Sequence, residues 1–554
     1  MFRASKNDQG ENQNRPKVVI LGGGYGGVYA ALRLEKAARK GQIDLALVSR
    51  ENYFLQKPLM AEAVSGSIQP LHIVNPIRRV TRFTNFYKTE VEAIDTEYRQ
   101  VTLRYPGHTH YHYLTYDHLL IALGSSTDLS RLPGMTEHAF PFQTLGDAFF
   151  LRNHLISVIE MAEIEPDPEE KRELLTFVVV GGGYTGVEVV AEINDFVREA
   201  ARSYLHVDSA EVRVILLHSG DRILPELDEG LAQFGHRILE RKGIEVRLNS
   251  RTVGATTQSA ILSDGTTIPT RTPVAAIGSS PNRVLDSLPC PRERGRLAVD
   301  ETLAVPGCPG VWAVGDCAAI PDVISGGTSP PTAQYALREA QHVARNIMAV
   351  INGGEPRPFS HKNLGVFVPL GRFSAAAQLL GLKLPGFPAW WLYRTYYLSQ
   401  IPGIERKLRV VLDWTLELFF RWDIVQLDVI RTEGITRAHY EAGEVIFRQG
   451  ELARNFYIIL NGEVQVFRQQ NGKEIPVATL GAGEYFGEMS LLREMKHTAS
   501  VRSLTPLNLL VMSGGDFTAL ASSSTKLGKF LESVIEQRLS GNGGPPQPID
   551  TPVC

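Results

Sequence analysis

Two glycine-rich turns in this chain have the spacing that binds a dinucleotide. The first, 22–27, directly follows an apolar run over 17–21, and the second, 181–186, follows an apolar run over 177–180. In such a G-x-G-x-x-G turn the first glycine allows a tight bend, the second admits a pyrophosphate, and the third lets helix and strand pack closely. The N–H groups that open the next helix attract the anion. Two turns predict two dinucleotides, most simply FAD and NADH or NADPH, with hydride passing between their rings.

These turns must be positioned by a buried parallel strand before each and a helix after each. The apolar runs predict the strands, and the following residues predict helices from Val28 to Lys40 and from Val187 onward. One glycine motif alone is weak evidence, but two in this context favour paired dinucleotide-binding units. The residues expected to contact the cofactors are Gly22, Gly24, Gly26 and Gly27 in the first turn and Gly181, Gly183, Thr185 and Gly186 in the second.

Both units lack the acidic residue that normally binds the adenosine ribose at the end of the second strand. The predicted strand over 43–48 is followed by Ser49 and Arg50, and the strand over 212–217 by His218. The missing acid removes repulsion against a 2′-phosphate, and a protonated His218 would attract one. Two interpretations stay open: either NADPH is used at least as well as NADH, or backbone groups hold the ribose and the preference is unchanged.

Composition limits the remaining classes of function. A chain of 554 residues needs several domains, and its net charge of -3 argues against a general nucleic-acid binder. No stretch is long and apolar enough for a transmembrane helix, and the polar residues 1–15 predict a disordered start without a signal peptide. The four cysteines have no metal-binding spacing, so no metal site is predicted, and their sparseness favours a reducing compartment.

Further motifs follow the glycine turns in a set order. They are Phe54-Leu55-Gln56-Lys57-Pro58-Leu59, Tyr116 to Gly124, Leu132-Pro133-Gly134, Ala276-Ile277-Gly278, Val311 to Asp316, and Pro330-Pro331-Thr332-Ala333-Gln334. With these motifs, residues 17–427 resemble the type II NADH:quinone oxidoreductases, flavoproteins with a disulfide-reductase-like fold. The resemblance implies an enzyme that passes electrons from NAD(P)H through FAD to a membrane quinone without pumping protons.

The resemblance also implies roles for individual residues. Asp316 would bind the ribityl chain of FAD, Glu188 would face the nicotinamide, and Gln334 would bond a quinone carbonyl. The small Ala333 would let a flat ring approach the flavin, although 330–334 could instead be only a helix start that packs on FAD. The other cofactor-binding positions are Ser49, Arg50, Lys57, Ala122, Gly124 and Gly278. No cysteine precedes Cys290, which excludes a dithiol relay in the first unit.

Residues 376–430 are rich in aromatic and aliphatic side chains and predict a helix from Ile404 to Val425. Its polar residues form one narrow stripe: Arg406, Arg409, Asp413, Glu417 and Arg421. Such a helix is either buried in a core or lies in a membrane interface. The resemblance favours peripheral attachment to the inner, cytoplasmic face of the membrane. The basic residues expected to meet anionic lipids are Arg372, Lys383, Arg394, Arg406, Lys407 and Arg409.

The last part of the chain changes to short strands joined by Asn-Gly turns at 461–462 and 471–472, which predicts an antiparallel barrel or jelly roll. Residues 441–512 resemble the cyclic-nucleotide-binding domain, with a pocket formed by Gly487, Glu488, Met489, Ser490, His497, Thr498 and Ala499. His497 stands where that family has an arginine for the phosphate. A purely structural domain and a sensor for a cyclic nucleotide or another small effector both stay open. A helix is predicted over 526–539, and too little chain follows 516 for a DNA-binding helix-turn-helix.

The predicted fold class is α/β, with two Rossmann-like dinucleotide-binding domains of disulfide-reductase-like fold and a C-terminal all-β jelly-roll domain. The expected order is a disordered 1–15, an FAD domain over 16–128 and 295–375, an NAD(P)H domain over 129–294, a membrane-associating segment over 376–430, the barrel over 431–540 and a tail over 541–554. A flavin-based redox sensor, or an oxidoreductase that uses oxygen or a small redox protein, is the alternative function. Whether the chain forms a homodimer stays open.

Overall fold

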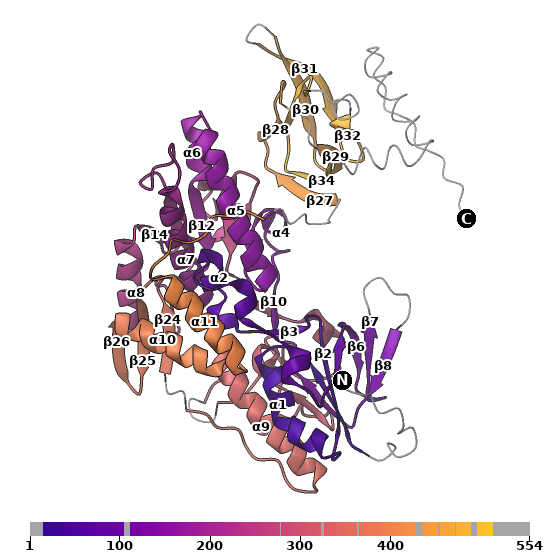
Figure 1. Ribbon diagram of the computed structural model, residues 1–554. Helices are drawn as coiled ribbons and strands as arrows, with labels where there is room; N and C mark the ends of the chain where they lie inside the picture. Colours follow the sequence, from indigo (N-terminus) through magenta and orange to yellow (C-terminus); the bar gives the residue numbers. More distant parts are fainter. Residues whose placement is uncertain are drawn as a thin grey trace, which may run out of the picture.

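The computed structural model describes residues 15–104, 111–277, 279–322, 326–362, 365–427, 435–451, 455–470, 473–488 and 496–513. Figure 1 shows a body with two α/β units and a separate, smaller β domain formed by the C-terminal part of the chain. Gly278, Met489 and Ser490 lie outside the described residues, as do the predicted helix over 526–539 and the predicted disordered tail.

The first unit is built on a five-stranded parallel sheet with the order β22-β9-β1-β2-β5. Its strands are β1 (Lys17–Leu21), β2 (Asp44–Ser49), β5 (Asn85–Lys88), β9 (His118–Ile121) and β22 (Val311–Ala313). Helices α1 (Tyr25–Arg39) and α9 (Ala333–Ile351) lie side by side against it (Figure 1). Strand β1 is buried from Val18 to Leu21, as expected of a central strand covered on both faces.

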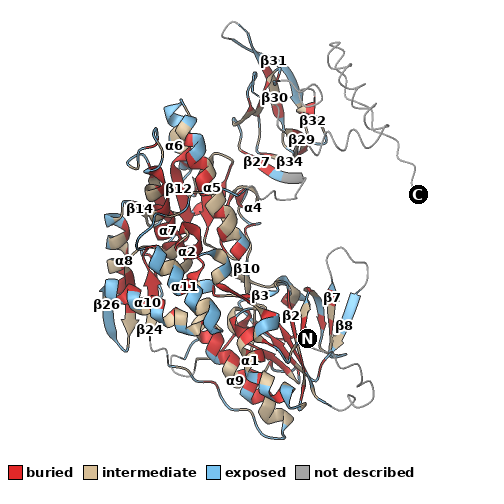
Figure 2. Cartoon of the chain, viewed as in Figure 1, coloured by how far each residue is buried: buried red, intermediate tan, exposed pale blue. Residues whose placement is uncertain are grey.

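The second unit repeats this plan in the sheet β11-β18-β12-β13-β14, again all parallel. Its strands are β11 (Phe140–Pro141), β12 (Thr176–Val180), β13 (Arg213–Leu217), β14 (Ile244–Arg247) and β18 (Thr272–Ala275), with helices α5 (Leu145–Ile164), α7 (Tyr184–Ala201) and α8 (Glu229–Arg241). Figure 2 shows the buried residues concentrated in these two sheets and the helices on them. The prediction of two Rossmann-like units is confirmed.

Shorter elements complete the body. Strands β10 (Ser125–Thr127) and β19 (Ser279–Pro281) pair antiparallel where the chain passes between the units. The others are β3 (Tyr53–Leu55), α2 (Glu62–Ser65), β4 (Val74–Pro76), α3 (Ile77–Val80), β6 (Glu90–Asp95), β7 (Gln100–Arg104), β8 (Tyr111–Thr115), α4 (Met135–His138), α6 (Pro168–Leu174), β15 (Thr252–Ala255), β16 (Ser259–Leu262), β17 (Thr267–Pro269), β20 (Arg292–Glu293), β21 (Arg296–Ala298) and β23 (Ala318–Ala319).

Both cofactor-binding helices begin earlier than predicted. Helix α1 starts at Tyr25 and α7 at Tyr184, three residues before Val28 and Val187. The last glycines of each turn therefore lie inside the first helical turn. A Cβ atom at Gly27 would come within 1.8 Å of the Gly22 carbonyl oxygen, so glycine is needed there because the helix approaches the preceding turn so closely.

The segment after α9 forms a three-stranded sheet of β24 (Gly365–Pro369), β25 (Ala375–Leu379) and β26 (Leu382–Gly386). Helices α10 (Phe387–Gln400) and α11 (Ile404–Leu416) follow it. The prediction that this last helix continues to Val425 is wrong. The chain leaves the helix at Glu417, whose carboxylate is buried and paired with Arg394 at 3.0 Å and Arg372 at 3.4 Å. These long-range ion pairs hold Glu417 inside the protein. A turn over 417–420 and then a segment without regular secondary structure replace the helix.

The C-terminal domain consists of two four-stranded antiparallel sheets, β27-β34-β29-β32 and β28-β33-β30-β31, which confirms the predicted jelly-roll class. Its strands are β27 (Ile435–Tyr440), β28 (Val445–Phe447), β29 (Asn455–Asn461), β30 (Val464–Gln470), β31 (Lys473–Leu480), β32 (Tyr485–Phe486), β33 (Ser500–Ser503) and β34 (Leu507–Ser513). The barrel contacts the body at α4, where the His439 N–H donates to His138 Nε2 at 2.9 Å.

Cys290 and Cys308 form a disulfide, and Cys317 is a buried free thiol. The irregular cysteine spacing did not predict this pairing, so the cysteines no longer support the expectation of a reducing compartment.

Among the described helices, none combines the length and the apolar character needed to cross a bilayer.

Candidate active site

The first glycine turn forms a cradle made of backbone. Gly22 has φ +116°, and a Cβ atom there would lie 2.1 Å from the Ala122 carbonyl oxygen. A Cβ atom at Gly26 would lie 3.1 Å from that of Ala122. By contrast, a Cβ atom at Gly24 would meet no protein atom within 4 Å. Gly22, Gly26 and Gly27 therefore serve the packing of the turn, and Gly24 lines open space at the start of α1, where a pyrophosphate fits.

The second turn repeats this geometry. Gly181 has φ +115° and approaches the Ala276 carbonyl, while a Cβ atom at Gly186 would lie 1.7 Å from the Gly181 carbonyl oxygen. At Gly183 the nearest atom to an added Cβ is Glu226 Oε1 at 3.8 Å. Thr185 is the second residue of α7, beside this opening. The residues present therefore fit a dinucleotide at each turn.

The two positions that lack the ribose acid differ in their contacts. Ser49 is buried at the end of β2 and packs against Gly23, whereas Arg50 is exposed and pairs with Glu51 at 3.6 Å. His218 Nδ1 accepts a hydrogen bond from the Gly182 N–H at 3.1 Å. With Nδ1 as the acceptor of this bond, the other ring nitrogen, Nε2, is left as the donor.

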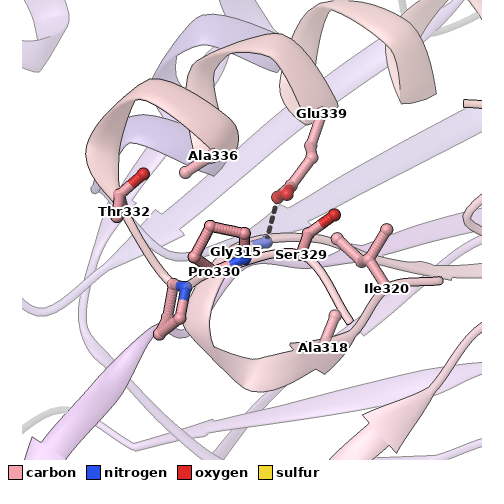
Figure 3. A pocket seen from close by; sticks show the side chains of 9 residues that line it. Gly315, Ala318, Ile320, Ser329, Pro330, Thr332, Ala336 and Glu339 are labelled. Carbon is pink, nitrogen blue, oxygen red and sulfur yellow. Dashed lines mark hydrogen bonds between the residues drawn. The ribbon is translucent and has the colours of Figure 1, made fainter. Parts of the chain in front are cut away.

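The turn that carries Asp316 is held from two sides. The Ser125 hydroxyl, next to Gly124, donates to Asp316 Oδ2 at 2.9 Å. From α9, the buried Glu339 accepts the Gly315 N–H at 2.8 Å, as Figure 3 shows. Burial raises the pKa of Glu339 to about 8. The sequence prediction missed Glu339, although an acid on the otherwise apolar face of a helix is a recognisable signal.

A small hollow lies between this turn and the start of α9 (Figure 3). It is lined by Gly315, Ala318, Ile320, Ser329, Pro330, Pro331, Thr332, Ala336 and Glu339. The Thr332 hydroxyl caps the helix by accepting the Tyr335 N–H at 3.4 Å. Ala333 and Gln334 are the first two residues of α9. The predicted quinone segment therefore begins at the same hollow as the turn that carries Asp316.

Three side chains from separate elements meet at this end of α9. The Gln334 side chain hydrogen-bonds Tyr397 of α10. Tyr397 also interacts electrostatically with Glu188, the fifth residue of α7. The nearby Tyr393 hydroxyl donates to the Pro58 carbonyl at 2.6 Å, next to the exposed Lys57. Burial, with Glu62 and Glu192 nearby, raises the pKa of Glu188 well above its usual range. The two tyrosines were missed, although their spacing of four residues places them on one helix face.

Behind these residues lies a buried ion cluster. Arg394 of α10 is 6% exposed and bonds Glu62 at 2.8 Å and Glu417 at 3.0 Å. Its guanidinium also lies over the rings of Trp390 and Trp414 at 4.0 and 4.7 Å. The expectation that Arg394 meets lipids is therefore wrong, because its charge is fully used inside the protein.

Comparison with known proteins agrees with this geometry. The model of the pyridine nucleotide-disulphide oxidoreductase family matches residues 16–340, and that of the cyclic nucleotide-binding domain matches residues 437–524. The type II NADH:quinone oxidoreductase of Mycobacterium tuberculosis is 32% identical, with 73% of this chain and 88% of that protein covered. The chain belongs to the type II NADH:quinone oxidoreductase family.

A second relative and a solved structure add to this comparison. The demethylphylloquinone reductase of Synechocystis is 31% identical, with 74% of this chain and 98% of that protein covered. The solved structure of NDH2 from Plasmodium falciparum in complex with NADH has a TM-score of 0.69 at 20% identity, with 74% of this chain and 100% of that chain covered, which shows a shared fold. The predicted family and the predicted cyclic-nucleotide-binding type of the barrel are both confirmed.

In this family member, helix α11 presents Arg406 and Asp413 of its polar stripe to the protein, while Arg409 is exposed. Asp413 bonds His72 at 2.6 Å and accepts the Gln69 N–H at 3.1 Å, and Arg406 donates to the Leu71 carbonyl at 2.8 Å. The apolar side chains on the other face of the helix are exposed: Ile404, Leu408, Val411, Leu412 and Leu416. Of the two sequence interpretations, a helix wholly buried in the core is thereby excluded, although Val410 is fully buried and Trp414 packs against the core.

The remaining predicted lipid contacts also have protein partners. Lys383 pairs with Asp228 at 2.5 Å, Lys407 donates to the Ser399 carbonyl at 2.9 Å, and Arg409 pairs with Glu405 at 2.8 Å. Arg372 donates to the Glu417 carbonyl. Lys383 and Arg409 are still partly exposed, so charge as well as apolar surface is present near α11.

The described part of the predicted pocket in the barrel contains a stacked pair of rings. The buried His497 ring stacks on Phe447, with the ring centroids 3.6 Å apart and an interplanar angle of 8°. Burial lowers the pKa of His497, which disfavours the charged form. Glu488 is also buried, while Gly487 adopts φ +94° and Thr498 and Ala499 lie nearer the surface. The group that replaces the phosphate-binding arginine is thus a neutral ring packed against an aromatic side chain.

Proposed function

We propose that this protein oxidises NADH and NADPH through FAD and reduces a membrane quinone without pumping protons. The observation that carries this proposal is the meeting of Glu188, Gln334 and Tyr397 from three elements beside two open glycine cradles. A site with a nicotinamide on one side and an acceptor on the other needs groups from both units at one point.

The first turn, with Ser49, Arg50, Lys57, Ala122, Gly124 and Asp316, would hold FAD, and the second turn, with His218 and Gly278, would hold the nicotinamide cofactor. Bound FAD supplies the chemistry of accepting a hydride from one partner and passing electrons to another. Glu188 would orient the nicotinamide. Gln334, tied to Tyr397, would donate its amide to a quinone carbonyl beside the small Ala333.

We expect NADH and NADPH to be used with similar efficiency. His218 replaces the acid that would repel a 2′-phosphate, and its Nε2–H can bond either ribose. A large preference for NADH in steady-state kcat/KM at pH 7 would contradict this expectation. A strong preference for NADPH that grows as the pH falls would instead indicate a protonated His218.

The outward apolar face of α11 supports peripheral attachment to a membrane, which we place on the inner, cytoplasmic face. A helix held to the protein by its polar stripe leaves its apolar side chains for the acyl boundary of one leaflet. Attachment there would bring the site beside Tyr397 next to the quinone pool.

The barrel is proposed to be a structural domain, because the stack of His497 on Phe447 leaves the phosphate position without a cation. A regulatory role of the barrel would act through the contact of His439 with His138 in α4. Helix α4 follows β10, where the chain passes between the two α/β units.

Stopped-flow spectroscopy of the purified protein tests the main proposal. NADH should bleach the flavin absorbance, and a ubiquinone or menaquinone analogue should restore it within the turnover time. Bleaching without reoxidation by any quinone would overturn the proposal and favour a sensor. Reoxidation by oxygen that is faster than by quinone would favour an oxidase.

A further inference from the structure

Strand β27 of the barrel is buried on both of its faces at its C-terminal end. Ala438, His439 and Tyr440 are consecutive residues of this strand, and all three are buried. Side chains alternate between the two faces of a strand, so neighbouring residues cannot face the same core. Ala438 and Tyr440 belong to the hydrophobic core of the barrel. The opposite face, which carries His439, is therefore covered by something outside that core.

Helix α4 of the body covers this face. A Cβ atom at Gly134, the N-cap of α4, would lie 3.2 Å from His439 Cδ2, so the imidazole ring rests on a residue without a side chain. At the other end of α4, His138 Nε2 lies 2.9 Å from both the backbone nitrogen and the backbone oxygen of His439. Figure 1 shows β27 as the strand of the barrel that faces this helix.

The backbone of β27 takes part in the same contact. Within the described part of the barrel, β27 stands at the edge of the sheet β27-β34-β29-β32. Outward-facing N–H and C=O groups at a sheet edge need partners from elsewhere, and the backbone of His439 finds one in the His138 ring. The imidazole of His439 is fixed to the barrel, because its Nδ1 lies 2.7 Å from Asn508 Oδ1 on β34. The barrel therefore presents a fixed edge to α4.

The other side of α4 faces the second glycine turn. Met135 of α4 is fully buried in a small cluster with Ala255 and Ala275. Ile277, which follows β18, packs against the same cluster. A Cβ atom at Gly181 would lie 2.8 Å from Ile277 Cγ2, so Ile277 lies directly against the first glycine of that turn. Helix α4 is thus placed between the barrel and the turn that would hold the nicotinamide cofactor.

Helix α4 cannot fix its own position, because it has only four residues. Its start is packed tightly on β15, where a Cβ atom at Gly134 would lie 1.8 Å from the Ala255 carbonyl oxygen. Protein interiors are close-packed, so a displacement on one side of such a helix reaches the residues on its other side. A second contact of the barrel, Arg448 with Glu170 at 3.7 Å, is exposed and contributes little. Of these two contacts, the one between His439 and α4 is therefore the one through which the barrel acts on the body.

We infer that the barrel stabilises the nicotinamide site: by packing His439 on α4, it holds Ile277 against the second glycine turn and raises the affinity for NAD(P)H. The inference rests on the proposed function, since it takes the second turn as the site of the nicotinamide cofactor. His439 contacts neither a cofactor nor the reacting atoms, so it is a positioning residue. Coupling between two sites is reciprocal, so a bound nicotinamide cofactor must also strengthen the contact between the barrel and α4.

The decisive variant is His439→Ala in the full-length protein with its flavin bound. Calorimetry with NAD⁺, which binds without reducing the flavin, should give a dissociation constant that is raised about fivefold or more. In stopped-flow, the NADH concentration for half-maximal bleaching rate should rise by a similar factor. The limiting rates of bleaching and of reoxidation by quinone should stay within about twofold of the wild type.

Two further variants separate positioning from a general effect on the barrel. His439→Gln can keep a hydrogen bond to Asn508 and should recover part of the affinity for NAD⁺. Val477→Ala is the matched control, because Val477 is an exposed residue of β31, on the side of the barrel away from α4 (Figure 1). It should bind NAD⁺ like the wild type.

Amide hydrogen exchange supplies a readout that needs no turnover. The His439 N–H donates to His138, so its exchange rate reports how often the contact between the barrel and α4 opens. In the wild type, saturating NAD⁺ should slow this exchange by about the factor by which His439→Ala weakens NAD⁺ binding. In Val477→Ala the same slowing is expected.

Equal NAD⁺ affinity in His439→Ala and the wild type would overturn the coupling alone. Exchange at His439 of the wild type that does not respond to bound NAD⁺ would overturn it too, even if His439→Ala fails to fold. Parallel losses of bound flavin, bleaching rate and reoxidation rate in His439→Ala would also overturn it, because they indicate a general structural role. A wild-type protein that does not bind NAD⁺ would overturn the proposed nicotinamide site together with the coupling that rests on it.

Discussion

The body and the barrel each carry a motif for a phosphate-bearing ligand, yet the space beside the motif differs. In the body, a Cβ atom added to Gly24 meets no protein atom within 4 Å. In the barrel, the ring at the phosphate-binding position, His497, stacks on Phe447 with 3.6 Å between the centroids. One site is open and made of backbone, and the other is filled by side chains.

This difference shows why the two motifs tolerate change differently. The glycine turns offer backbone N–H groups, which the chain keeps as long as the turn itself folds. The barrel would instead depend on one side-chain charge, and a single replacement removes it while the hydrophobic core of the barrel persists. Family membership of the barrel therefore predicts its fold better than its ligand.

Substitution within the first glycine turn should give the largest effect. In Gly27→Ala the new Cβ atom would lie 1.8 Å from the Gly22 carbonyl oxygen, so α1 must move off the sheet. We expect near-complete loss of bound flavin and a loss of more than ~2 kcal/mol in the free energy of unfolding. Flavin absorbance per protein and denaturant unfolding measure both.

Gly24→Ala is the control for this change. Its Cβ atom has free space in the protein, so flavin binding should weaken while the free energy of unfolding stays close to that of the wild type. If Gly27→Ala retains its flavin, the turn is not packed as described and the comparison fails.

The pH dependence of stability should have opposite signs in the two regions. The pKa of Glu339 is raised from 4.5 to about 8, so the folded body binds more protons than the unfolded chain between these values. The stabilising contribution of Glu339 is thus complete below about pH 4.5 and is lost as the pH rises toward 8, by up to about 1.4 kcal/mol per pH unit. Glu339→Gln should flatten this slope in urea unfolding at pH 6 and 8.

For the barrel the sign reverses, because burial lowers the pKa of His497 from 6.5 and the folded state then binds fewer protons. Its stability should fall as the pH drops below about 6.5. All tryptophans of the chain lie in the body, so their fluorescence follows the body alone, and circular dichroism follows both regions. If the free energy of unfolding changed with pH in the same direction in both regions, the roles given to Glu339 and His497 would be contradicted.

Membrane attachment should depend on the body and not on the barrel. Leu408→Glu combined with Leu412→Glu places charge on the outward face of α11, where these side chains are 63% and 55% exposed. We expect at least about tenfold weaker partitioning into vesicles of phosphatidylethanolamine and phosphatidylglycerol, measured by co-sedimentation. Val477→Glu, at a barrel residue that is 53% exposed, is the matched control and should bind like the wild type. Undiminished binding of the double variant would contradict the proposed attachment.

The smallest effect is expected for an attempt to restore ligand binding in the barrel. His497→Arg supplies the missing cation, and calorimetry with cyclic AMP should detect a gain of roughly tenfold in affinity over a wild type that does not bind at micromolar concentrations. Lys496→Arg, at the exposed neighbouring position, should bring no gain. Micromolar binding by the wild type would show that the stacked His497 opens for a ligand and would restore the sensor interpretation.

The sequence by itself determined the repeated features of this protein. Strands before the glycine turns, helices after them and the hairpin of β30 with β31 follow from interactions within a few residues, so local patterns predicted them. The hairpin signal at Asn461-Gly462 was wrong, because β29 and β30 on its two sides belong to different sheets. The order of the motifs was sufficient to predict the family. The closeness of the Asp316 turn to Ala333 and Gln334 in the fold agrees with that prediction. Helix starts were displaced by three residues, because the close approach of Gly27 to Gly22 is not visible in a hydrophobic pattern.

Only the tertiary structure decided which way α11 faces and where it ends. Its polar stripe looks like a solvent-exposed surface in the sequence, yet Asp413 bonds His72, 341 positions away. Glu417 ends the helix because it pairs with Arg394, which also bonds the distant Glu62. Buried charges must find partners wherever the fold brings them, and that choice depends on the approach of elements far apart in the chain.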